Sequence, residues 1–207
     1  MPETRDPSPD GAATADPSYT ERLVTLEQSG LKRLLPTQAP YRWNLRRLRL
    51  GRVLDVGCGV GRNLQNCGPD SVGVDHNATS VATARARGLT AYTADEFAAD
   101  PELGRPGAFD SMLVAHVLEH LDAETCEQLL RGYLPSVRPG GKVVLITPQP
   151  AGYRSDPTHV RFVDFPVLRA HAEGAGLRVE RSFSFPLPEP AGKVFKYNEY
   201  VLVGIVP

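Results

Sequence analysis

The sequence has little of what marks membrane, secreted or nucleic-acid-binding proteins. Its 207 residues contain no run near about 18 consecutive apolar residues, so no membrane span is expected. The N-terminus has no apolar segment of the secretory type. The formal net charge is −1, which disfavours nucleic acid as a partner. The three cysteines show no Cys-x-x-Cys spacing, and we therefore predict reduced thiols in a cytoplasmic protein.

Glycine and proline are abundant by comparison, with 19 residues each. Prolines and small polar residues dominate residues 1–17, which predicts a disordered tail. Residues 18–50 space their leucines loosely at helical intervals and are broken by prolines, which predicts an N-terminal helical cap ending in a short basic helix over 41–50. The arginines of that helix are interpreted as a solvated face. We expect residues 18–207 to form a single domain.

Beyond residue 50, short apolar runs alternate with helical patterns and glycine turns. Strands are expected at 52–56, 71–74, 89–92, 109–115, 142–147, 177–183 and 197–206. Helices are expected from about residue 61 and over 77–87, 123–137 and 165–175. This alternation predicts an α/β fold with a doubly wound, Rossmann-like sheet of seven strands, mostly parallel and with an antiparallel last strand.

The strongest local signal runs from Asp55 to Gly61 and reads Asp-Val-Gly-Cys-Gly-Val-Gly. Glycines after a first parallel strand let the backbone turn tightly and approach a ligand. A Walker loop is excluded because Arg62 and Asn63 follow Gly61 in place of Lys-Ser/Thr. The spacing also differs from the G-x-G-x-x-G of dinucleotide-binding folds. The carboxylate of Asp55 suits a ligand that carries an ammonium and a sulfonium better than it suits a phosphate.

This segment resembles the first motif of class I S-adenosylmethionine-dependent methyltransferases, and further matches follow in order over about half the chain. Gly73-Val74-Asp75 is similar to the second motif, whose acid bonds the ribose, and Ala94-Asp95 to the segment that meets the adenine. The resemblance implies S-adenosylmethionine as the cofactor. The residues we assign to it are Asp55, Gly57, Gly59, Gly61, Asp75, His76, Asn77, Asp95, Glu96 and His116. A helix cap is the competing interpretation of Asp95, and an NAD-dependent dehydrogenase is the alternative from another class.

A cluster of histidines and a glutamate follows the fourth predicted strand. His116, Glu119 and His120 are spaced i, i+3 and i+4 and therefore share one face of a helical turn, and His159 lies in the loop after the fifth strand. Glu119, His120 and His159 are predicted to be catalytic. Three interpretations stay open: a divalent metal such as Mg²⁺ held by these three residues together with His116, a metal-free role for His159 as general base, or structural histidines.

The metal interpretation rests on a resemblance in spacing alone. The plant small-RNA 2′-O-methyltransferases hold Mg²⁺ with carboxylates and histidines after strand four and a later histidine. This chain has His116 where those enzymes have a glutamate, and it lacks their RNA-binding domains.

The acceptor is predicted to be a hydroxyl of a small molecule, since no Asn/Asp-Pro-Pro-Tyr of amino-methylating enzymes follows strand four. Aromatic faces and guanidinium groups suit a saccharide, and the residues predicted to contact it are Tyr19, Trp43, Tyr153, Arg154 and Arg161. The high content of alanine, arginine, glycine and proline points to an actinobacterial source, where small enzymes of this kind resemble saccharide O-methyltransferases acting on mannosides of the methylmannose polysaccharide. The alternatives are a quinone or polyketide hydroxyl, or a non-catalytic cofactor-binding protein. Neither nucleic acid nor a membrane is expected as a partner, and a homodimer stays open.

Overall fold

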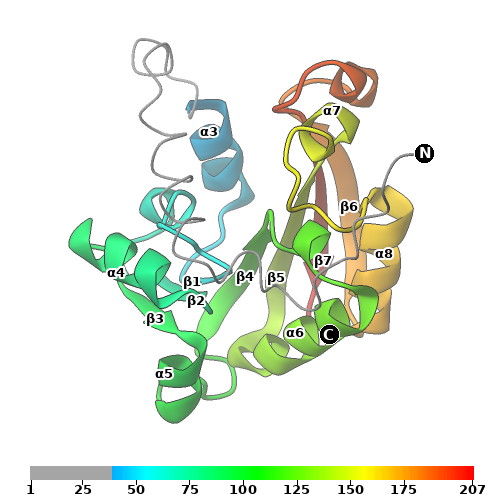
Figure 1. Ribbon diagram of the computed structural model, residues 1–207. Coiled ribbons are helices and arrows are strands. Elements are labelled where there is room, and N and C mark those ends of the chain that lie inside the picture. Colours follow the sequence, from blue (N-terminus) through cyan, green and yellow to red (C-terminus); the bar gives the residue numbers. More distant parts are fainter. Residues whose placement is uncertain (1–38) are drawn as a thin grey trace.

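The computed structural model describes residues 39–207 (Figure 1). The predicted tail over 1–17, the predicted cap before residue 39 and Tyr19 lie outside the described residues. A seven-stranded sheet with the order β3-β2-β1-β4-β5-β7-β6 runs through the described part. Its strands are β1 (Val53–Val56), β2 (Val72–Asp75), β3 (Ala91–Thr93), β4 (Phe109–Ala115), β5 (Val137–Pro148), β6 (Arg178–Phe185) and β7 (Glu199–Ile205).

The strand directions confirm the predicted sheet. Strands β1 to β5 pair in parallel, and β7 pairs antiparallel with both β5 and β6. The chain builds outward from β1 in one direction through β2 and β3, and then returns to place β4 and β5 on the other side of β1. In open sheets of this type, ligands bind beyond the carboxyl ends of the strands where the order reverses. The expected binding region is therefore the end of β1 and β4.

Helices cover both faces of the sheet (Figure 1). The α-helices are α3 (Ala39–Leu48), α4 (Ala78–Ala86), α5 (Ala94–Ala99), α6 (Ala123–Tyr133), α7 (Pro150–Tyr153) and α8 (Phe165–Gly174). Successive strand residues point to opposite faces. Met112 and Val114 of β4 belong to the buried cluster that α5, α6 and α8 complete, whereas Leu113 and Ala115 belong to the cluster that α3 completes. Both faces are apolar, which is why the strands read as continuous hydrophobic runs.

Several predicted boundaries are wrong, and the reasons are local. The helix expected from about residue 61 is only a 3-10 turn, η2 (Leu64–Asn66), because Gly68 and Pro69 follow closely. The helix expected over 123–137 ends at Tyr133 and passes into the 3-10 turn η4 (Leu134–Ser136), since Pro135 lacks the N–H that a further α-turn needs. Strand β5 consequently begins at Val137, earlier than expected.

The short basic helix, expected over 41–50, is α3. It lies beside the carboxyl ends of the central strands, where Leu45 and Leu48 are buried against β4 and β5 residues. Within residues 39–207, no helix combines the length and the apolar character needed to cross a membrane.

Candidate active site

The glycine loop after β1 depends on backbone conformations that favour glycine. Gly57, Gly59 and Gly61 have φ angles of 74°, 52° and 85°, all in the left-handed region. A Cβ on Gly57 would lie 2.3 Å from Cγ2 of Val117, the second residue after β4. The backbone N–H of Gly57 donates to the carbonyl of Val74 at the end of β2 at 2.8 Å. The loop is therefore closely packed between the ends of β2 and β4.

Asp75 ends β2 and ties the loop to the next helix. Its Oδ2 accepts the N–H of Gly59 at 2.8 Å, and its Oδ1 accepts the N–H of Asn77 at 2.8 Å. Asn77 in turn caps α4, its side-chain oxygen accepting the N–H groups of Thr79 and Ser80. His76 is half exposed, with Nδ1 3.6 Å from Oδ1 of Asp75. Each carboxylate oxygen keeps a further lone pair, so Asp75 can still accept hydroxyl groups.

Asp55 in β1 is a fully buried carboxyl group. Its side chain is 1% exposed, and its Oδ2 has no hydrogen-bond partner among the described residues. Burial, followed by the nearby carboxylate of Asp75, raises the pKa of Asp55 to about 8. A cationic ligand group beside Asp55 would supply the missing partner.

The structure gives the two acids after β3 different surroundings. Asp95 is exposed in the first turn of α5. Glu96 completes a capping box with Thr93, accepting the Thr93 N–H at 2.7 Å, and also pairs with Arg85 at 2.6 Å. The carboxylate of Glu96 thus stabilises the start of α5, a role that the assignment to the cofactor did not anticipate.

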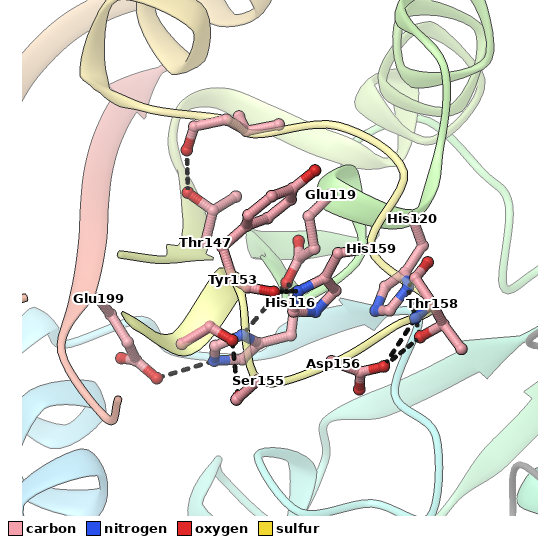
Figure 2. A network of polar contacts seen from close by, with 12 residues as sticks. His116, Glu119, His120, Thr147, Tyr153, Ser155, Asp156, Thr158, His159 and Glu199 are labelled. Atoms are coloured by element: carbon pink, nitrogen blue, oxygen red, sulfur yellow. Dashed lines mark hydrogen bonds and ion pairs between the residues drawn. The ribbon is translucent and has the colours of Figure 1, made fainter. Parts of the chain in front are cut away.

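His116 joins two glutamates at the end of β4 (Figure 2). Its backbone has a φ of 59°, and its ring reaches Oε1 of Glu199 from Nε2 at 2.8 Å and Oε1 of Glu119 from Nδ1 at 3.3 Å. Desolvation beside the strands would lower the pKa of His116, although its side chain is 43% exposed, but the hydrogen bonds and charges of the two glutamates raise this pKa to about 10. His116 is therefore an imidazolium at neutral pH that bridges β4 and β7.

Glu119, His120 and His159 converge at the same place (Figure 2). Their ligand atoms all lie within 4.8 Å of one another, with Nε2 of His159 4.0 Å from Oε1 of Glu119. Glu119 and His120 come from the 3-10 turn η3 (Leu118–His120), and His159 from the loop after α7. Apart from the 3.3 Å contact of its Oε1 with His116, the fully buried Glu119 has no hydrogen-bond partner among residues 39–207. Burial lowers the pKa of His120 and so favours its neutral form.

The residues predicted to contact the acceptor are only partly brought to this cluster. The ring of Tyr153 stacks on that of His159, with centroids 5.3 Å apart. Arg154 is exposed and donates to the carbonyl of Lys193 at 3.1 Å. Trp43 is 57% exposed on α3, with Arg47 over its ring.

Arg161 is directed away from the cluster. Its Nη2 contacts Sγ of Cys126 at 3.2 Å and Nε2 of His171 at 2.8 Å. Those two residues are buried on α6 and α8, so the guanidinium serves the packing between these helices. These contacts do not bring Arg161 to the cluster, and its contact with the acceptor stays a prediction.

Sequence reasoning missed Glu199, the first residue of β7. It is 7% exposed and forms the 2.8 Å contact with His116 from a strand 83 residues further along the chain. A carboxylate at the start of an otherwise apolar strand was the available signal. Tyr41 of α3 also approaches this corner, donating its hydroxyl hydrogen bond to the carbonyl of Tyr197.

Comparisons with known proteins agree with this geometry. The family model described as a methyltransferase domain matches residues 22–182. A ubiquinone biosynthesis O-methyltransferase of Xanthomonas euvesicatoria is 29% identical over 127 residues, which are 58% of this chain and 52% of the relative. The chain thus spans about half the length of that relative.

Solved structures share the fold at low sequence identity. A SAM-dependent methyltransferase from Archaeoglobus fulgidus superposes with a TM-score of 0.66 at 21% identity, covering 88% of this chain and 99% of the other. A TehB-like SAM-dependent methyltransferase from Corynebacterium glutamicum gives a TM-score of 0.65 at 19% identity, covering 93% and 100%. These likenesses show the fold and leave the acceptor open.

Proposed function

The chain belongs to the methyltransferase-domain family, which makes it an S-adenosylmethionine-dependent methyltransferase, and we propose that it methylates a hydroxyl oxygen of a small molecule. One observation carries this proposal. The glycine loop after β1 packs against Val117, and two residues further on begins the buried cluster of Glu119, His120 and His159. A cofactor on the loop would therefore present its methyl group toward groups able to activate a hydroxyl.

The cofactor is assigned to the carboxyl ends of β1, β2 and β3. Asp55 would face the ammonium group of its methionine part, and Asp75 would accept the ribose hydroxyls. Asp95 lies in the first turn of α5 beyond β3 and would meet the adenine.

The reaction is an in-line displacement. The acceptor oxygen forms a bond to the methyl carbon, the bond from that carbon to sulfur breaks, and its electron pair stays on sulfur to give S-adenosylhomocysteine. The hydroxyl proton leaves to a base or to solvent. A hydroxyl is a weak nucleophile, so positioning alone would not suffice and the acceptor needs activation. The cluster of Glu119, His120 and His159 is suited to that task, since each offers a proton acceptor or a ligand atom.

A saccharide hydroxyl, as in a mannoside, is the acceptor we propose first, because Tyr153 and Trp43 are aromatic residues that are not fully buried and the guanidinium of Arg47 lies over the Trp43 ring. The phenolic hydroxyl of a quinone precursor is the second candidate. It is favoured by the similarity to the ubiquinone biosynthesis O-methyltransferase.

The residues present differ from the oxygen-rich sites that Mg²⁺ usually takes, so the Mg²⁺ expected from the spacing stays a prediction. Mg²⁺ prefers octahedral sites of carboxylate, carbonyl and water oxygens. The cluster offers two imidazoles and one carboxylate, so we route no step of the reaction through Mg²⁺.

The test is methyl transfer from S-adenosylmethionine to a panel of mannosides, catechols and polyketide phenols, followed by S-adenosylhomocysteine release and mass spectrometry of the product. We expect O-methylation of one of these classes of acceptor. In His159→Gln the rate of methyl transfer should be about 10²- to 10⁴-fold lower, with S-adenosylhomocysteine binding retained. Glu119→Gln changes a residue of the cluster. Its matched control is Glu173→Gln, which makes the same change on the exposed face of α8. Methylation of nitrogen only, or tight NADH binding without S-adenosylmethionine binding, would contradict the proposal.

A further inference from the structure

We propose that the end of the molecule that carries the active site docks on the surface of an anionic lipid bilayer. The contact is made by two segments, residues 39–50 with α3 and residues 186–198 between β6 and β7, whose exposed side chains we call the rim surface. Its apolar members are Trp43, Leu187, Val194 and Tyr197, and its basic members are Arg42, Arg46, Arg47, Arg49, Lys193 and Lys196. A membrane contact does not require methyl transfer and so goes beyond the proposed function.

The exposed large hydrophobic side chains of residues 39–207 gather at one end of the sheet. There are five of them, and all lie in segments at the carboxyl end of the parallel strands: Trp43, Val160, Leu187, Val194 and Tyr197. Figure 1 shows α3, α7 and the connection between β6 and β7 at this same end. Val194 is 85% exposed. Single exposed apolar side chains are ordinary, but a gathering of them marks an interaction surface.

The two segments touch, which makes the rim one surface. The hydroxyl of Tyr41 donates to the carbonyl of Tyr197. The ring of Trp43 stacks on that of Phe185, the last residue of β6, with centroids 6.2 Å apart. The guanidinium of Arg47 lies 4.6 Å from the centroid of the Trp43 ring. Trp43 is therefore held by two neighbours although more than half of it is exposed, so binding needs little further ordering of this side chain.

The rim surface is basic in a chain whose formal net charge is −1. Residues 39–50 and 186–198 contain the six basic residues named above and a single acidic residue, Glu189. No ion pair within residues 39–207 involves any of these six. Each lysine or arginine close to an anionic membrane strengthens binding about fivefold. The charge of the rim is thus complementary to an anionic lipid surface.

The kinds of side chain on the rim favour a bilayer over other anionic partners. Tryptophan and tyrosine are enriched at membrane–water interfaces, and arginine and lysine reach head groups while their stems lie along apolar surface. A nucleic acid would contact the arginines and Trp43 but would leave Leu187 and Val194 in water, whereas acyl chains would cover them. The expectation of no membrane partner rested on the missing membrane span and on the net charge of the whole chain, and a peripheral contact depends on neither.

Docking through the rim would face the active site toward the bilayer. Tyr197 lies two residues before Glu199, the partner of His116, and Tyr41 of α3 approaches the same corner. An acceptor hydroxyl at the head group of an amphiphile would then reach the site without leaving the membrane. This substrate class rests on the proposed function, whereas the membrane contact rests on the rim surface alone.

The experiment uses the fluorescence of Trp43, which is the single tryptophan of the sequence and lies in the rim. The full chain without an affinity tag is titrated with vesicles of phosphatidylcholine alone and with vesicles in which half of the lipid is phosphatidylglycerol. We expect the mixed vesicles to shift the emission of Trp43 to shorter wavelength and brominated acyl chains to quench it. Binding to phosphatidylcholine alone should be at least about 100-fold weaker, and added salt should weaken binding to the mixed vesicles.

Three variants test the assignment of the contact to the rim. Arg42→Gln combined with Arg46→Gln should weaken binding to the mixed vesicles about 25-fold, since each charge contributes about fivefold. The matched control is Arg105→Gln combined with Arg169→Gln, which removes two exposed arginines outside the rim and should change binding by less than about twofold. Val194→Ser should weaken binding about three- to tenfold, because less apolar surface enters the bilayer. Thermal unfolding shows whether each variant is folded, and each keeps the tryptophan.

An unshifted emission spectrum with mixed vesicles, or equal binding to the two kinds of vesicle, would overturn the proposal. Single-stranded RNA that binds more tightly than the mixed vesicles would also overturn it. A dimer in light scattering that Val194→Ser dissociates would do so too, because a second copy would then cover the rim. Vesicle binding without methyl transfer to any hydroxyl would leave the rim proposal standing and remove the O-methyltransferase proposal. Methyl transfer without vesicle binding would do the reverse.

Discussion

The buried carboxyl of Asp55 predicts that cofactor binding depends on pH. Burial and the neighbouring Asp75 raise the pKa of Asp55 to about 8 in the ligand-free chain, so at pH 7 the carboxyl is mostly protonated. If the ammonium group of the cofactor pairs with the carboxylate form, binding must first release that proton. At pH 7 this costs about 1.4 kcal/mol relative to binding well above pH 8, which is about a tenfold loss of affinity.

The measurement is calorimetric titration with S-adenosylhomocysteine, which keeps the ammonium group, between pH 6 and pH 8. The dissociation constant should fall about 50-fold over that interval, because the carboxylate fraction of Asp55 rises from about 1% to about half. Repeating the titration at pH 7 in buffers of different ionisation enthalpy should show release of about 0.9 proton for each cofactor bound. Asp55→Asn should bind weakly at every pH and release no proton.

His76 is the control residue, because it lies beside Asp75 and is half exposed. His76→Gln should keep the pH dependence of the unaltered chain. The reasoning is refuted if the affinity is the same at pH 6 and pH 8, or if the dependence disappears in His76→Gln and persists in Asp55→Asn.

Three further outcomes follow from the site. Asp75→Ala should weaken S-adenosylhomocysteine binding at least about 100-fold in calorimetry, since two hydrogen bonds to a charged group are lost. Gly57→Ala should lower the thermal unfolding midpoint, because the left-handed φ of 74° costs about 1 to 2 kcal/mol and the new Cβ meets Val117; Val117→Ala should restore only part of the loss. For His116, burial lowers the pKa and the glutamates raise it, with a net rise from 6.5 to about 10, so its stabilising contribution is complete below pH 6.5 and is lost as the pH rises through 10. The unfolding midpoint should therefore fall from pH 8 to pH 10 more steeply in the unaltered chain than in His116→Gln.

The sequence predicted the sheet well, and it also located the glycine loop after β1, because both signals are local. Asp55 to Gly61 lies within one strand and one turn, and the left-handed backbone of Gly57 and Gly61 explains why glycine is needed there. The helix expected over 77–87 likewise depends on neighbouring residues, since Asn77 caps α4 through the N–H groups of Thr79 and Ser80. The same local reasoning failed after Gly61, where a helix was expected, because periodicity gives little warning of the Gly68-Pro69 stop.

The acceptor side could be predicted only in part because its geometry comes from distant segments. The spacing of Glu119 and His120 indicated a shared face, but the orientation of their partner His159 depends on the backbone carbonyl of Tyr153. The ion pair of His116 depends on Glu199. That residue lies in β7, the last strand in the chain, which is placed beside β5. The position of a backbone carbonyl cannot be inferred from a residue pattern. A single glutamate in an apolar strand has no second polar residue at a fixed spacing that would mark it as part of a site.

The two halves of the site share one physical feature, a fully buried carboxyl group with an oxygen that has no hydrogen-bond partner within residues 39–207. Asp55 lies at the end of β1 and Glu119 beyond the end of β4, on adjacent strands. Apolar strand packing is strong enough to hold both in the ligand-free chain, at a cost in stability that a bound cation would offset. Any ligand that binds the folded chain alone also stabilises it. A cofactor whose ammonium group pairs with the carboxylate of Asp55 would therefore offset part of that cost when it binds.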